Sequence, residues 1–131
     1  MTEPLPEVVE VDDRIAEAAE AMVELVKTAG VACSTDGDQL ALPGGWLVLT
    51  ELGPTRLDGE TFETVWTLYL IASDSSTGTA LRQLGDMFGK VRHLADESTP
   101  AEPVVLQLAN YSATPLPSIA VNIRTETRPT T

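Results

Sequence analysis

The fold is decided by residues 63–95, which read ETVWTLYLIASDSSTGTALRQLGDMFGKVRHLA. The first part, from about Glu63 to Ser73, is rich in β-branched and aromatic residues and predicts a strand. Successive side chains of a strand point to opposite faces of a sheet. One face then carries Trp66, Leu68 and Leu70, and the other carries Val65, Thr67, Tyr69 and Ile71. Both sets are largely apolar, so we expect both faces to need cover.

The second part of this stretch predicts an amphipathic helix. Ser73–Gly78 supplies turn and N-cap residues, and apolar residues then recur every three or four positions: Leu81, Leu84, Phe88, Val91 and Ala95. Gly85 and Gly89 lower the helix propensity by about 1 kcal/mol each. We therefore expect these two glycines to let the helix approach the sheet closely.

The flanking sequence predicts one more helix and several shorter strands. Asp12 or Asp13 is the expected N-cap of a helix that ends at Gly30. The strands expected besides the central one are Val31–Cys33, Trp46–Thr50, Val104–Ala109 and Ser118–Thr125. The prediction is an α+β fold, with a small mixed or antiparallel sheet of about four to five strands and two helices packed on one face.

The length of 131 residues predicts one domain, expected over residues 12–125. Residues 1–11 carry two prolines and several charges and are expected to form a flexible arm. Residues 126–131 are expected to form a polar tail. The chain shows no signal peptide and no apolar run near the roughly 20 residues that span a bilayer, so we expect a cytoplasmic site of synthesis and no membrane partner.

The charge is strongly acidic, with 20 Asp and Glu against 8 Lys and Arg and a formal net charge of −12. Such a field repels phosphate backbones and disfavours direct binding of DNA or RNA. It is compatible with a surface past which DNA slides without sticking.

No group of residues predicts catalysis, a metal site or a cofactor site. His93 lacks a triad or a nucleophile elbow around it and is interpreted as a helix-end histidine. Cys33, the single cysteine, excludes an internal disulfide and is interpreted as a small buried side chain. Asp36-Gly37-Asp38 lacks the further ligands of a calcium loop and predicts a turn. We expect no enzyme.

The order of these elements resembles the tail terminator family of long-tailed, siphovirus-like bacteriophages. The resemblance rests on the N-terminal helix ending at Gly30-Val31, on Trp46–Thr50, on Thr64–Leu70, on Ala80–Leu94 and on Leu116–Ile123. It implies a structural protein of the virion, assembled in the host cytoplasm as a hexameric ring of identical subunits at the head–tail junction. Such a ring stops polymerisation of the tail tube protein and offers a docking surface to head-completion proteins, while DNA passes through without specific binding.

A ring requires two different patches on each subunit. The expected patches are the apolar strand face with Val65, Thr67, Tyr69 and Ile71, and a protruding hairpin, Gly53–Glu60, with Pro54, Arg56 and Leu57. Two alternatives stay open. One is another phage neck or tail-completion protein, and the other is a cytoplasmic α+β binding module or enzyme subunit.

Overall fold

The computed structural model describes residues 6–55, 62–97, 99–108 and 110–127. Its order of elements is α1 (Pro6–Thr28), β1 (Cys33–Ser34), β2 (Gly44–Thr55), β3 (Phe62–Ile71), α2 (Thr77–Val91), a 3-10 turn (Arg92–Leu94), β4 (Glu102–Leu106) and β5 (Leu116–Thr127). Within the described residues, no helix has both the length and the apolar character needed to cross a bilayer.

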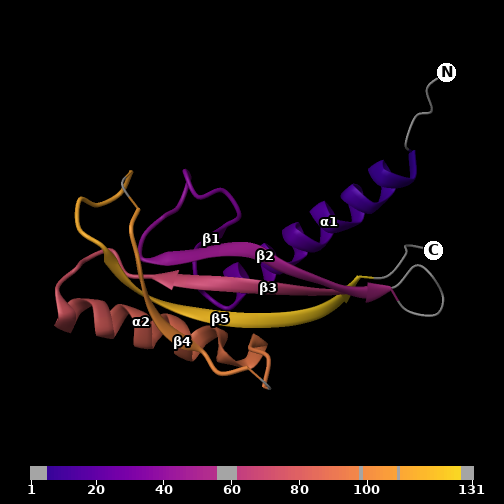
Figure 1. Ribbon diagram of the computed structural model, residues 1–131. Coiled ribbons are helices and arrows are strands. Elements are labelled where there is room, and N and C mark those ends of the chain that lie inside the picture. Colours follow the sequence, from indigo (N-terminus) through magenta and orange to yellow (C-terminus); the bar gives the residue numbers. More distant parts are fainter. Residues whose placement is uncertain (1–5, 56–61, 98, 109, 128–131) are drawn as a thin grey trace.

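The five strands form one mixed sheet in the order β1-β2-β3-β5-β4. β1 runs parallel to β2, and the other neighbours are antiparallel. The long strands β2, β3 and β5 extend beyond the short strands β1 and β4 toward one end of the sheet (Figure 1). The predicted α+β class, with its mixed sheet and two helices, is confirmed.

The two helices pack on the same face of the sheet. The core between them and the sheet contains Met22 and Val26 from α1, Leu84 and Val91 from α2, and the predicted set Trp66, Leu68 and Leu70 from β3. α1 contacts β1, β2 and β5, whereas α2 contacts β3 and β5. Both helices therefore contact β5, and they follow separate paths across the sheet (Figure 1).

A second, smaller core covers the other face at one end of the sheet. Leu40, Ile71 and Leu116 are buried there, with Trp46 and Tyr69 packed against them. The cover comes from the segments before β2 and before β5, where Leu40 N–H donates to Tyr111 Oη at 2.7 Å. The expectation of an apolar β3 face left bare is therefore wrong at this end, because Ile71 is fully buried within the chain.

Several boundaries differ from the sequence prediction, among them the end of β2, which runs to Thr55 and so into the predicted hairpin Gly53–Glu60. α1 begins at Pro6 rather than at Asp12 or Asp13, so residues 6–11, expected in the arm, are helical. Proline suits the first turn of a helix because its fixed φ is already helical and its missing N–H would have no helical partner there. β5 continues to Thr127, two residues into the expected tail. Residues 1–5 and 128–131 lie outside the described residues.

The glycines divide into two groups. At Gly44 an added Cβ would lie 2.1 Å from the Ala41 carbonyl oxygen, and at Gly45 it would lie 2.8 Å from Leu68 Cδ1. The start of β2 therefore requires glycine. Gly85 and Gly89 are exposed, and an added Cβ would meet nothing within 4 Å. The expectation that these two allow close packing on the sheet is wrong.

Candidate interaction surfaces at the sheet edges

The outer edge of β2 is covered over only a short length. β1 pairs with β2 at Gly45 and Trp46, where Gly45 N–H donates to Ala32 O at 2.7 Å. From Leu47 to Thr55, no strand in the described ranges pairs with this edge. Pro54 lies in this stretch, and proline, which has no N–H to donate, occurs within sheets mainly on edge strands.

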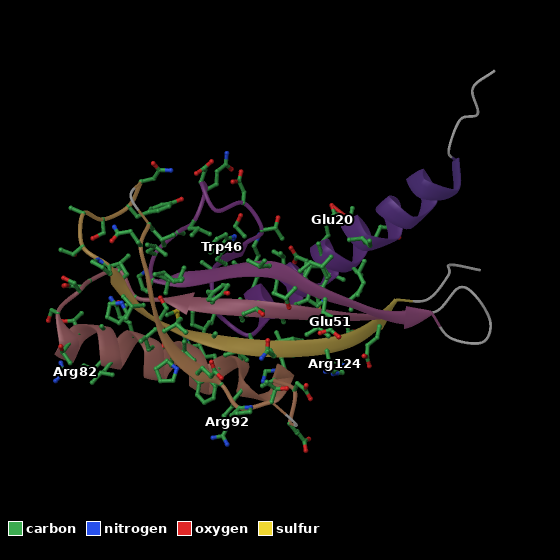
Figure 2. All side chains as sticks on the ribbon, in the orientation of Figure 1. Glu20, Trp46, Glu51, Arg82, Arg92 and Arg124 are labelled. Atoms are coloured by element: carbon green, nitrogen blue, oxygen red, sulfur yellow. The ribbon has the colours of Figure 1, made fainter. Side chains whose placement is uncertain are left out.

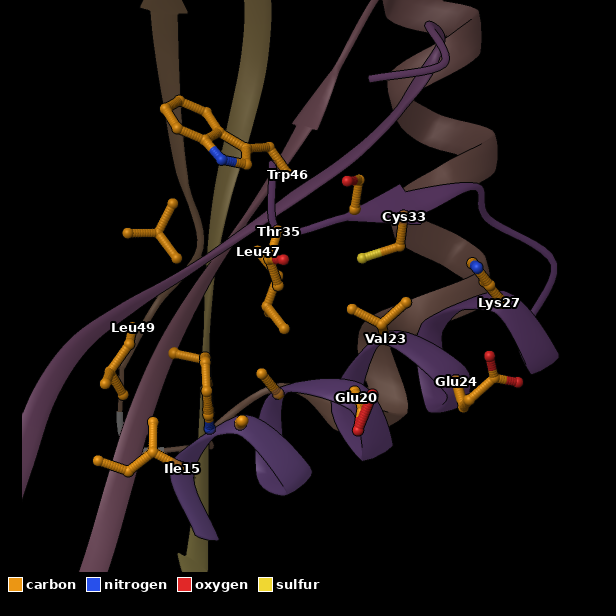
Figure 3. A pocket seen from close by; sticks show the side chains of 15 residues that line it. Ile15, Glu20, Val23, Glu24, Lys27, Cys33, Thr35, Trp46, Leu47 and Leu49 are labelled. Carbon is orange, nitrogen blue, oxygen red and sulfur yellow. The ribbon is translucent and has the colours of Figure 1, made fainter. Parts of the chain in front are cut away.

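A groove of about 930 Å³ lies between this edge and α1. Its walls are mostly apolar, with Ile15, Ala19 and Val23 from the helix, and Leu47 and Leu49 from the strand. Figure 3 shows these side chains gathered between the α1 ribbon and β2. Glu20, Glu24 and Lys27 add charged groups to the lining, so the groove has an apolar floor with charges from α1.

The outer edge of β5 is also covered over only part of its length. β4 pairs with β5 from Leu116 to Ala120, and Asp96 N–H then donates to Asn122 O at 2.7 Å. Beyond Asn122, no strand of the described chain pairs with this edge. Arg124 lies there and donates to Glu63 and to Asp96. The hydrogen bond to Glu63, and then the one to Asp96, raise the pKa of Arg124.

A second, smaller groove of about 420 Å³ lies between α2 and β4. Its lining is almost wholly apolar: Leu81, Leu84, Gly85, Pro103, Val104, Val105, Pro117, Ser118 and Ile119. Leu81 is 63% exposed and Val105 is 67% exposed. This edge of the molecule therefore presents apolar side chains to its surroundings.

The predicted interface residues of β3 lie on the face opposite the helices and are mostly buried within the chain. Val65 and Thr67 are each 7% exposed and Ile71 is fully buried. Tyr69 packs against Trp46, with ring centroids 5.7 Å apart. These residues contact other parts of the same subunit, which leaves less apolar surface for a neighbour than the sequence pattern indicated.

The middle of that face is polar. Thr67 Oγ1 donates to Asn122 Oδ1 at 3.0 Å and lies 3.3 Å from Thr50 Oγ1, and Thr50 Oγ1 donates to the Val65 carbonyl at 3.1 Å. These bonds link β2, β3 and β5 side by side. Of the predicted hairpin residues, Arg56 and Leu57 lie outside the described residues, and Pro54 is described in its backbone alone.

The residues considered for chemistry have ordinary structural surroundings. Burial raises the pKa of the Cys33 thiol from 9.0 to about 11, with the charge of Lys27 opposing this effect, so the nucleophilic thiolate is disfavoured. Asp36 Oδ1 accepts the Asp38 N–H at 2.9 Å, as in an Asx turn. His93 is exposed in the 3-10 turn after α2. In the described ranges, no three His, Cys, Asp or Glu residues form a group that could hold a metal ion.

Sequence reasoning missed the two open edges, because strand order decides which edges are free and local periodicity does not encode strand order. One signal was present: Gly53-Pro54, which marks the continuation of β2 as an edge strand. Comparison of the chain with protein-family models, with curated proteins and with solved structures gave no match.

Proposed function

We propose that this chain is a non-catalytic subunit of a phage virion, a tail terminator that closes into a ring at the head–tail junction. The observation that carries the proposal is the pair of open edges on β2 and β5. Both strands run antiparallel to β3, so they run parallel to each other. β1 and β4 cover only the first part of each, so the uncovered parts lie at the same end of the sheet.

Open sheet edges are a hazard for a protein that works alone, because their unpaired N–H and C=O groups recruit other strands. The open edges of β2 and β5 lie at the same end of the sheet and face away from each other. This arrangement suits a subunit that has one neighbour on each side. When the open β5 edge of one subunit meets the open β2 edge of the next, two different patches are in contact, which makes the contact heterologous. Heterologous contacts form a ring when the rotation that relates neighbouring subunits closes on itself. The element order, from the N-terminal helix to the final strand after Leu-Pro, also supports the resemblance to tail terminators.

The proposed partners follow from this role. The ring caps the tail tube protein, halts its polymerisation and receives a head-completion protein. DNA passes through the ring, and the net charge of −12 supports passage without binding, since an acidic wall repels phosphates.

The test is polymerisation of tail tube subunits with and without this protein. The proposal predicts short tubes that carry one cap at one end and that stop growing once capped. Tubes that grow equally in both reactions, with the protein bound only to head connectors, would favour the neck-protein alternative. A monomer that binds extended peptides along β2 would favour the binding-module alternative.

A further inference from the structure

We infer that the contact between neighbouring copies brings the α2–β4 edge of one subunit onto the α1–β2 edge of the next, with Arg82 and Arg92 facing Glu20 and Glu24. This inference rests on the proposed ring and names the two surfaces that close it. It follows from the positions of the helices, from their charges and from the apolar surface on both sides.

The two helices border opposite outer strands of the sheet. α1 borders β2 across the larger groove and α2 borders β4 across the smaller one, on the same face. When the β5–β4 edge of one copy lies beside the β2 edge of another, the α2 of the first copy comes beside the α1 of the second. A contact between sheet edges therefore brings the two helices together as well.

The charges of the two helices are complementary. Glu17, Glu20 and Glu24 are exposed and stand three and four residues apart, so they share one face of α1. Arg82 and Arg92 are exposed in α2 and in the turn that follows it, and Figure 2 shows both pointing away from the sheet. Together with Lys90 they are three of the 8 Lys and Arg residues of the chain, which makes this segment the natural partner for an acidic helix.

These charges are available for a neighbour. Lys90 pairs with Asp86 on α2 at 3.1 Å, whereas Arg82 and Arg92 have no ion pair within the described parts of the chain. Glu20 and Glu24 also have none there. Charge pairs of this kind contribute to the orientation and the rate of association more than to affinity, and opposing like charges cost several kcal/mol.

Apolar surface accompanies the charges on both sides. The α2–β4 edge exposes Leu81 and Val105 beside its groove, and Ala16, Ala19 and Val23 line the groove between α1 and β2. Arg82, Gly85 and Gly89 are spaced by three and four residues, so they share one face of α2, and Arg92 follows in the next turn. An added Cβ at either glycine would meet nothing within 4 Å, which leaves room for a helix to approach there.

The test uses two charge-reversal variants of the full chain. Glu20→Lys/Glu24→Lys reverses the acidic surface, and Arg82→Glu/Arg92→Glu reverses the basic surface. We expect each variant alone to need at least about tenfold more protein than the wild type to assemble, as measured by native mass spectrometry. An equimolar mixture of the two variants is expected to restore assembly. Their subunits can alternate, so that every contact joins an acidic surface to a basic one.

The control is Ser75→Lys/Ala113→Lys, which raises the net charge, as Glu20→Lys/Glu24→Lys does, at exposed loop positions outside both grooves. It should assemble like the wild type, and circular dichroism should show all variants folded. Folded variants that assemble at the wild-type concentration, or a mixture that fails to recover, would overturn the interface while leaving the ring function standing. Normal assembly with no capping of tail tubes would reject the terminator function and leave the interface standing.

Discussion

The backbone N–H of Leu40 donates to the phenolic oxygen of Tyr111 at 2.7 Å across a separation of 71 residues. This bond joins the segment before β2 to the segment before β5. A second contact reinforces it, since Asn110 Nδ2 donates to Asp38 Oδ1 at 2.9 Å. The two segments together cover Ile71 and Leu116 on the face away from the helices.

Tyr111→Phe should lower the free energy of unfolding by about 1 kcal/mol, because the half-buried Leu40 N–H loses its acceptor. Urea denaturation measures the change. Tyr69→Phe is the matched control, since no hydrogen bond to the Tyr69 hydroxyl exists among the described residues, and it should change stability by less than about 0.5 kcal/mol. Equal effects of the two substitutions would show that the bond contributes nothing.

Ile71→Ala should lower the free energy of unfolding by about 2–5 kcal/mol, because the side chain is fully buried and its loss leaves a cavity. Leu81→Ala, which removes a side chain that is 63% exposed, should cost less than about 0.5 kcal/mol in the monomer. If Ile71→Ala were as mild as Leu81→Ala while abolishing assembly, the β3 face would be an interface between subunits and not an internal core.

Two glycine substitutions should act in opposite directions. Gly44→Ala should destabilise the fold, because its Cβ would overlap the Ala41 carbonyl oxygen at 2.1 Å. Gly85→Ala should stabilise the monomer by up to about 1 kcal/mol, since the helix gains propensity and the methyl group meets open space. Thermal unfolding measures both changes. A neutral Gly44→Ala variant would contradict the packing described at the start of β2.

Ionisation of Cys33 should reduce stability at high pH. The pKa of the thiol is 9.0 in the unfolded chain, and burial raises it to about 11 in the folded one, so the unfolded state releases its proton first as the pH rises. The buried protonated thiol contributes fully to the free energy of unfolding below pH 9.0. This contribution is lost by about pH 11, which lowers the free energy of unfolding by roughly 2–3 kcal/mol.

The control for this prediction is Cys33→Ala, which removes the thiol and leaves every other ionisable group in place. The stability difference between wild type and Cys33→Ala should narrow between pH 9 and 11. A constant difference across that range would show that the thiol is not protected from ionisation. Slow alkylation of the native protein at neutral pH is the accompanying expectation.

Most of the fold was predictable because its signals are local. Trp66, Leu68 and Leu70 alternate in sequence and do face the helices. Of the apolar positions predicted for α2, Leu84, Phe88 and Val91 lie in the same core, whereas Leu81 is exposed. The prediction that α1 starts at Asp12 or Asp13 is wrong, because Pro6 also suits a helix start and the helix begins there. The cover over Ile71 was missed because the bond between Leu40 and Tyr111 joins two irregular segments that no periodicity connects.

The candidate surfaces were less predictable than the core. Their edges are open because β1 and β4 are short and because β5 inserts between β3 and β4, and both features belong to the tertiary arrangement. The exposure of Gly85 and Gly89 depends on how α2 is rotated against the sheet, which the spacing of the glycines does not determine.

Native mass spectrometry of the full wild-type chain, with electron microscopy of the same sample, tests the central claim most directly. The account predicts one closed oligomer above the monomer, a hexamer by the family resemblance, seen as a ring with a central opening. A chain that stays monomeric over the whole accessible concentration range, alone and with tail tube subunits, would contradict it.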